Sequence, residues 1–302
     1  MKEKTENRKE RVFEIDLLRA IPIFVVMLYH LCFDFSMIPS VTANYQEMII
    51  NYPALGSFID FSYDIVYSDL ILNVFAPLVG GIFLFLAGIS SVFTRSDLKR
   101  GLLLLIGSLA VSGATWLLDF IFAKLGFEAD VFIGWGILHI MCFSILLYAL
   151  IELFFRKVIK KEVPAFLMLL LGSAILFIGI ELNLGIQIGQ KEIIWPIDIT
   201  YGNPISQVEK FGYSVFFQSA IGRLGNTVDF WPIFPYTGVL YLGIAFGKVL
   251  YREKKSVIPK LNLRIFKPLC FIGRHTIYFY LLHQVVFILV LAIVFLSLGF
   301  RI

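Results

Sequence analysis

Three of the four histidines in this sequence lie inside apolar stretches of membrane-spanning length, where an ionisable side chain is costly and therefore a candidate for function. At about 1.5 Å of helix rise per residue, His30 lies about 20 Å from the inner end of the first stretch, and His283 about 22 Å from the inner end of the last. His139 enters from the other side and lies about 12 Å from the outer boundary. We therefore predict that the three imidazoles meet in the outer half of the membrane. Each could alternatively form a structural hydrogen bond between helices, and His283 could make a structural polar contact with Gln284.

Asp34 follows His30 by one helical turn, so the two side chains share a helix face. A carboxylate beside an imidazole orients the ring and raises its basicity. A general base needs both properties to take a proton from an amine or a hydroxyl. His30, Asp34, His139 and His283 are accordingly the predicted catalytic residues. Capping of the helix end or direct substrate binding is an alternative role for Asp34.

The inner ends of the same two stretches carry a second set of charged residues. Asp16 and Arg19 are spaced i and i+3 in the first stretch, and Arg274 lies at the start of the last. A planar guanidinium group can bind phosphate through two parallel hydrogen bonds. Arg19, Arg274 and Asp16 are therefore predicted to bind a cytosolic cofactor. A surface ion pair combined with membrane anchoring would explain the same residues without a ligand.

Other chemistries lack support in the sequence. Three histidines could bind zinc, but nothing in their spacing requires it, and we expect no metal site. The three cysteines lie in apolar segments and are expected to pack as small apolar side chains. The sequence has no phosphate-binding glycine loop, no HExxH motif and no recognisable serine nucleophile.

The elements that must position these residues are membrane helices. The chain is 59% hydrophobic and only 16% charged, unlike a typical water-soluble domain. Its apolar residues gather into runs of about 20, each long enough to cross about 30 Å of hydrocarbon. We predict an all-α polytopic helix bundle forming one domain, residues 1–302, with about seven spans. Their expected limits are Leu17–Ile38, Leu70–Phe93, Gly101–Ala123, Val131–Phe155, Pro164–Leu182, Phe230–Leu250 and Pro268–Leu298.

The distribution of positive charge predicts the orientation. Most Lys and Arg residues lie in the N-terminal tail and in the connections that follow the second, fourth and sixth spans. By the positive-inside rule these segments face the cytoplasm. We expect a multi-pass protein of the cell membrane with residues 1–13 as a cytoplasmic tail and the C-terminus outside. The formal charge of +4 is thus a topology signal, and no nucleic-acid partner is expected.

Two outer connections, residues 39–69 and 183–229, are long. Long connections in a compact fold are usually functional or disordered. The second contains Trp195, which we predict to contact substrate together with Asp229 and Trp231 at the start of the following span. Anchoring of the aromatic residues at the membrane surface is an equal alternative.

Six short stretches, taken in order, resemble the transmembrane acyltransferases, and most of all bacterial members of the heparan-α-glucosaminide N-acetyltransferase catalytic-domain family. The individual motifs are degenerate, and their order and spacing carry the resemblance. Together they cover most of the chain apart from the two long outer connections. The stretches are Glu14–Pro22, Met27–His30, Phe83–Ser90, Gly134–His139, Asp229–Val239 and Ile272–Gln284.

The resemblance implies that acetyl-CoA binds from the cytoplasm and that its acetyl group reaches an amine or hydroxyl of an envelope sugar or glycan outside. His30 would act as the base, and His283 or His139 would polarise the thioester carbonyl. This chain departs from the family pattern in two ways. Ala20 follows Arg19 where the family commonly has glycine, and residues 39–69 lack the additional histidine of the lysosomal relatives.

Two further functions and the oligomeric state stay open at this stage. A proton-coupled transporter could use the same histidines and Asp34 as a proton relay, although no internal repeat supports it. A non-catalytic partner of other membrane enzymes is the third reading. Besides membrane lipid, the expected partners are acyl-CoA and the glycan acceptor, and a homodimer is one option.

Overall fold

The computed structural model describes residues 12–126, 131–184, 229–259 and 264–301, and every regular element in these ranges is helical. Within these ranges, six helical segments are long and apolar enough to cross a membrane. Many apolar side chains on them face outward; Leu103 and Ile106, for example, are 62% and 67% exposed. Such surfaces suit contact with lipid. The predicted all-α, multi-pass membrane class is confirmed at this level.

Most of the long helices follow the expected spans, but the helix of the fourth span begins at Ile137 and not at the expected Val131. A π-helical turn, Ile71–Phe75, leads into α4, and another, Phe155–Ile159, extends α6. The principal helices are α1 (Phe13–Val41), α4 (Ala76–Ile89), α5 (Asp97–Leu125), α6 (Ile137–Phe154), α7 (Ala165–Leu184), α9 (Ile233–Leu250), α10 (Lys267–Arg274) and α11 (Thr276–Ser297).

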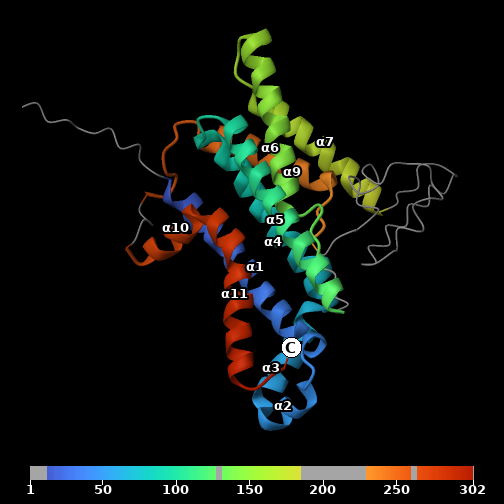
Figure 1. The fold of residues 1–302 in the computed structure, drawn as a ribbon. Coiled ribbons are helices and arrows are strands. Elements are labelled where there is room, and N and C mark those ends of the chain that lie inside the picture. Colours follow the sequence, from blue (N-terminus) through green and yellow to red (C-terminus); the bar gives the residue numbers. More distant parts are fainter. Residues whose placement is uncertain (1–11, 127–130, 185–228, 260–263, 302) are drawn as a thin grey trace, which may run out of the picture.

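The helices form two groups joined at α1 and α4 (Figure 1). One group contains α4, α5, α6, α7 and α9 around a core of fully buried residues that include Leu84, Ile140 and Ile244. Glycine allows its helices to approach closely, as is common in membranes. A Cβ atom at Gly243 of α9, for example, would collide with the carbonyl oxygen of Phe85 in α4. The other group contains α1, α10 and α11.

α1 runs parallel to α10 and α11 along its whole length. At one end Cys270 lies against the carbonyl oxygen of Phe13, and at the other Asn44 donates to the carbonyl oxygen of Gly299. The close approach near the first end depends on Gly273, because a Cβ atom there would collide with the carbonyl oxygen of Asp16. Ala20 packs at the same place and is 1% exposed. In this chain Gly273 supplies the small residue from the α10 side.

Two expectations about the elements need adjustment. The first outer connection is not a plain loop, because residues 39–69 contain α2 (Tyr45–Asn51) and α3 (Pro53–Val66), and α3 packs on α1. The long last span is two helices separated at His275. The fifth expected span corresponds to α7, which is 20 residues long. Most of the second outer connection lies outside the described residues.

Candidate functional site

His30 and His283 form a direct pair between α1 and α11. Nδ1 of His30 lies 2.6 Å from Nε2 of His283, and the two rings are nearly parallel, with 4° between their planes. Nδ1 of His283 lies 2.8 Å from the carbonyl oxygen of Tyr280 and 3.0 Å from that of Phe279. The predicted meeting of these two imidazoles is thus present in the structure.

The contacts of His283 define which nitrogen atoms carry protons. A carbonyl oxygen only accepts hydrogen bonds, so Nδ1 of His283 must be the donor. Nε2 of neutral His283 then has only a lone pair, and Nδ1–H of His30 must donate to it. This leaves Nε2 of His30 unprotonated. His283 is 5% exposed, so its hydrogen bonds to the backbone are buried and hold the ring in this orientation.

Asp34 pairs with Gln284 one helical turn from His30. Nε2 of Gln284 donates to Oδ1 of Asp34. The other two oxygen atoms, Oδ2 of Asp34 and Oε1 of Gln284, are buried and accept no hydrogen bond from the described part of the chain. We call His30, Asp34, His283 and Gln284 the paired-histidine site.

The expected support of His30 by Asp34 is not what the structure shows. The partner of His30 is His283, and the partner of Asp34 is Gln284. The i and i+4 positions do share a face, but the neighbouring helix α11 presents a separate polar residue to each. The suggested pairing of His283 with Gln284 is also absent, because these adjacent residues contact different side chains of α1.

His139 does not join the paired-histidine site, so the predicted meeting of three histidines is wrong for this residue. Its Nδ1 accepts from the backbone N–H of Gly136 at 3.0 Å, and its Nε2 lies 3.0 Å from the hydroxyl of Ser112. That hydroxyl donates to the carbonyl oxygen of Ile133, so it accepts from Nε2–H of His139. Both ring nitrogen atoms are thus engaged in holding the start of α6 against α5. The ring retains no N–H to polarise a carbonyl group.

Asp229 lies where α6, α11 and the entry to α9 meet. Oδ1 accepts from Nε1–H of Trp231 at 2.5 Å, and Oδ2 accepts from Tyr280 and from the backbone N–H of Ile137, each at 3.3 Å. We call these four residues the Asp229 junction. Burial raises the pKa of Asp229, and the three donors lower it by less.

Of the three residues predicted to bind substrate, the structure brings two into contact and does not describe the third. Asp229 and Trp231 are in direct contact, and Trp231 packs against Gly80 of α4. Both carboxylate oxygen atoms of Asp229 are occupied by donors of the chain itself, which indicates a structural role. Trp195 lies outside the described residues. Sequence reasoning missed Tyr280, whose position one turn before His283 was the available signal.

At the opposite end of α1, the charged residues predicted to bind a cofactor lie near one another. Nε of Arg274 lies 3.3 Å from Oδ2 of Asp16, and the two side chains are 41% and 14% exposed. Arg19 interacts electrostatically with Asp16 and also with Arg100 of α5. Two guanidinium groups are therefore close enough to repel each other, a repulsion that a bound anion would relieve.

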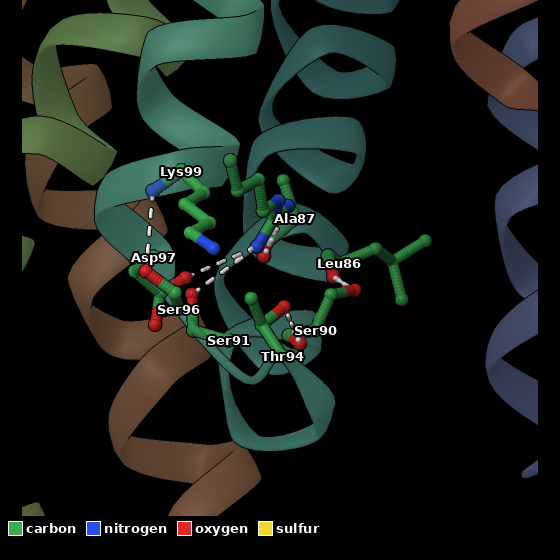
Figure 2. Close-up of polar contacts among 9 residues, drawn as sticks. Leu86, Ala87, Ser90, Ser91, Thr94, Ser96, Asp97 and Lys99 are labelled. Carbon is green, nitrogen blue, oxygen red and sulfur yellow. Dashed lines mark hydrogen bonds and ion pairs between the residues drawn. The ribbon is translucent and has the colours of Figure 1, made fainter.

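Arg100 is held in place by the end of α4 and the start of α5. Its guanidinium group donates to the carbonyl oxygen of Ala87 at 3.0 Å and to the hydroxyl of Ser91 at 3.2 Å, and lies 3.7 Å from Asp97. Figure 2 shows these contacts together with the cap of α5, in which Ser96 accepts from the backbone N–H of Lys99. Sequence analysis treated Arg100 only as a topology signal. The inner charged cluster consists of Asp16, Arg19, Arg100 and Arg274.

Among the described residues, no group of three or more His, Cys, Asp or Glu side chains could hold a metal ion. The candidate site therefore has two parts. One is an unprotonated imidazole nitrogen of His30, one helical turn from a carboxylate–amide pair that has two oxygen atoms without donors. The other is a cluster of arginine residues near the start of α1.

A protein-family model described as "Heparan-alpha-glucosaminide N-acetyltransferase, catalytic" matches residues 57–285, about three quarters of the chain. Comparison with curated proteins and with solved structures gives no match. The matched region contains His283 and the inner cluster residues Arg100 and Arg274, whereas His30 and Arg19 precede it.

Proposed function

The chain belongs to the heparan-alpha-glucosaminide N-acetyltransferase catalytic family, and on this premise we propose that it moves an acetyl group from cytosolic acetyl-CoA to an acceptor outside the membrane. The acceptor would offer an amine or hydroxyl of an envelope sugar or glycan. The observation that carries the proposal is the proton arrangement of the paired histidines, which leaves Nε2 of His30 as a free base.

In the proposed reaction, Nε2 of His30 takes the proton of the acceptor amine or hydroxyl. The acceptor atom forms a bond with the acetyl carbon, the carbon–sulfur bond of the thioester breaks, and the CoA thiolate leaves. The proton on His30 can then pass to that thiolate. Nε2 of His283 accepts from Nδ1–H of His30 throughout, which favours the imidazolium form that develops during transfer. His283 is a positioning residue in this scheme.

The donor would bind at the inner charged cluster. Arg19, Arg100 and Arg274 can donate hydrogen bonds to phosphate groups of CoA. Arg19 and His30 are about 16 Å apart along α1 at 1.5 Å per residue. The extended pantetheine arm would bridge this separation and bring the thioester to the paired-histidine site. The parallel course of α1 and α11 supports the proposal, because both helices then line the same path.

The topology needed for this reaction places residues 1–13 in the cytoplasm and the C-terminus outside, in line with the charge distribution. Helices that run parallel are separated by an even number of membrane crossings along the chain. If α1 is the first crossing, α11 must therefore be odd-numbered. Within the described residues, the six long apolar helices and α7 supply seven candidate crossings, a number that supports this topology.

Acetyl-CoA binding and transfer test the proposal. We expect acetyl-CoA to raise the melting temperature of the purified protein in detergent, and the variant Arg100→Gln to need at least tenfold more acetyl-CoA for the same shift. Lys157→Gln, at an exposed position of the inner end of α6, is the matched control. Absence of any shift with acetyl-CoA or CoA in the wild-type protein would reject the transferase.

A further inference from the structure

Oδ2 of Asp34 and Oε1 of Gln284 are buried acceptors without a donor from the described residues. A buried oxygen atom that accepts no hydrogen bond costs free energy, and native proteins leave few such atoms. At Asp229, by contrast, both carboxylate oxygen atoms accept hydrogen bonds. Among the described residues, Oδ1 of Asp97 and the hydroxyl of Tyr241 also lack a hydrogen-bond partner, but each is a single such atom, whereas Asp34 and Gln284 are in contact. Two acceptors without donors on adjoining side chains therefore call for an explanation.

The two oxygen atoms belong to one contact between α1 and α11. Nε2 of Gln284 donates to Oδ1 of Asp34, so the two side chains are in contact. Each side chain therefore has one further oxygen atom next to this hydrogen bond. The orientation of the amide follows from chemistry, because a carboxylate only accepts and must face the NH₂ group. Oε1 of Gln284 therefore points away from the carboxylate and is available to a donor.

The position of this pair relates it to the proposed reaction. Asp34 is one helical turn beyond His30, about 6 Å along the helix axis. Gln284 directly follows His283, the partner of His30. An acceptor whose nucleophilic atom contacts Nε2 of His30 could thus place a second part of the same molecule at Asp34 and Gln284.

We propose that Asp34 and Gln284 form the subsite that recognises the acceptor, and that they select molecules carrying additional O–H or N–H donors beside the nucleophile. This inference rests on the proposed function and assigns Asp34 to substrate binding. Both available atoms are acceptors, so the group that they bind must donate. A hydroxyl group next to an amine on a six-membered ring fits this requirement, whereas an apolar ring does not.

Binding of two small amines without CoA tests the subsite. D-glucosamine and cyclohexylamine both carry an amine on a six-membered ring, and only the first has hydroxyl groups. At about pH 6 both amines are largely protonated, since ordinary alkylamines titrate well above this value. We expect the wild-type protein to bind glucosamine at least tenfold more tightly, measured by calorimetry or by the shift in melting temperature.

Variants of Asp34 and Gln284 test whether these two residues cause the preference for glucosamine. Asp34→Ala and Gln284→Met should each weaken glucosamine binding at least tenfold and change cyclohexylamine binding much less. The control is Ser36→Ala, two residues along α1, because the hydroxyl of Ser36 already donates to the carbonyl oxygen of Phe33. Circular dichroism and gel filtration in detergent report whether each variant is folded, and Asp34→Asn replaces Asp34→Ala if the latter does not fold.

Equal binding of the two amines by the wild-type protein, or full glucosamine binding in both variants, would overturn the subsite. The proposed function fails by a different result, which is the absence of acetyl-CoA binding. Glucosamine binding without acetyl-CoA binding would leave the subsite standing and remove the transferase. Acetyl-CoA binding and transfer with no preference for hydroxylated acceptors would support the transferase and reject the subsite.

Discussion

The paired-histidine site and the neighbourhood of the Asp229 junction contain the same types of residue and use them differently. Each combines a histidine, a carboxylate and aromatic side chains between helices. Near the junction, His139 uses both ring nitrogen atoms and Asp229 both oxygen atoms in contacts with the chain. At the paired-histidine site, by contrast, Nε2 of His30 keeps its lone pair, and Asp34 and Gln284 each retain an oxygen atom without a donor.

The comparison shows that residue type alone does not distinguish a reactive site from a structural one inside a membrane. Both regions contain polar groups that would be costly in hydrocarbon. What differs is whether the chain supplies every hydrogen-bond partner. A fully partnered set stabilises the fold, whereas a partly partnered set has capacity left for a ligand or a proton.

The largest expected effect separates the two histidines. His30→Ala should lower kcat for acetyl transfer by about 10²- to 10⁴-fold, because the general base is removed. Acetyl-CoA should still raise its melting temperature. His139→Ala should keep near wild-type kcat per folded molecule, since its ring nitrogen atoms have structural partners. Turnover assays on both variants with quantified folded protein check this, and equal losses would contradict the comparison.

The two carboxylates should differ next in their effect on stability. Asp229→Ala leaves the donors of Trp231, Tyr280 and Ile137 without an acceptor. At about 1–3 kcal/mol for each buried unsatisfied group, the free energy of unfolding should fall by about 3 kcal/mol or more. Asp34→Ala leaves only the amide donor of Gln284 without an acceptor, so the free energy of unfolding should fall by about 1 kcal/mol. Denaturant unfolding in detergent measures both, and a larger loss for Asp34→Ala would reverse the assignment.

A smaller loss of stability is expected where His139 holds the start of α6. Ser112→Ala removes the acceptor of Nε2–H of His139 and the donor to the carbonyl oxygen of Ile133. The free energy of unfolding should fall by about 1–2 kcal/mol. Ser108→Ala, one turn earlier on α5, is the control, since its hydroxyl donates only within the helix. Identical stabilities of the two variants would argue against a bridging role for Ser112.

The smallest effect concerns pH. Burial raises the pKa of Asp229 above its ordinary value of 3.8. Its contribution to stability is therefore complete below the ordinary carboxyl range and is lost as pH rises through the raised pKa. As pH rises from the ordinary carboxyl range, the wild-type melting temperature should therefore fall relative to that of Asp229→Asn, whose side chain does not titrate. Parallel curves for the two proteins would exclude this contribution.

The histidines illustrate what could be predicted from the sequence. The depth of His30 and of His283 follows from the rise per residue, and the two do meet. The same estimate failed for His139 because the expected span began at Val131, whereas α6 begins at Ile137. His139 is therefore the third residue of the helix, where its ring caps the first turn instead of lying deep in the bundle. An error of one to two turns at a helix start was enough to change the role.

The sequence by itself determined the helical membrane class and most of the spans. It also determined how far apart residues lie along one helix, because helix rise is a local property. The tertiary structure alone decided which faces of α1 and α11 meet. It paired His30 with His283 and Asp34 with Gln284, brought Arg100 near Arg19, and occupied both oxygen atoms of Asp229. These outcomes depend on helix rotation and on neighbours distant in the chain, which local periodicity does not specify.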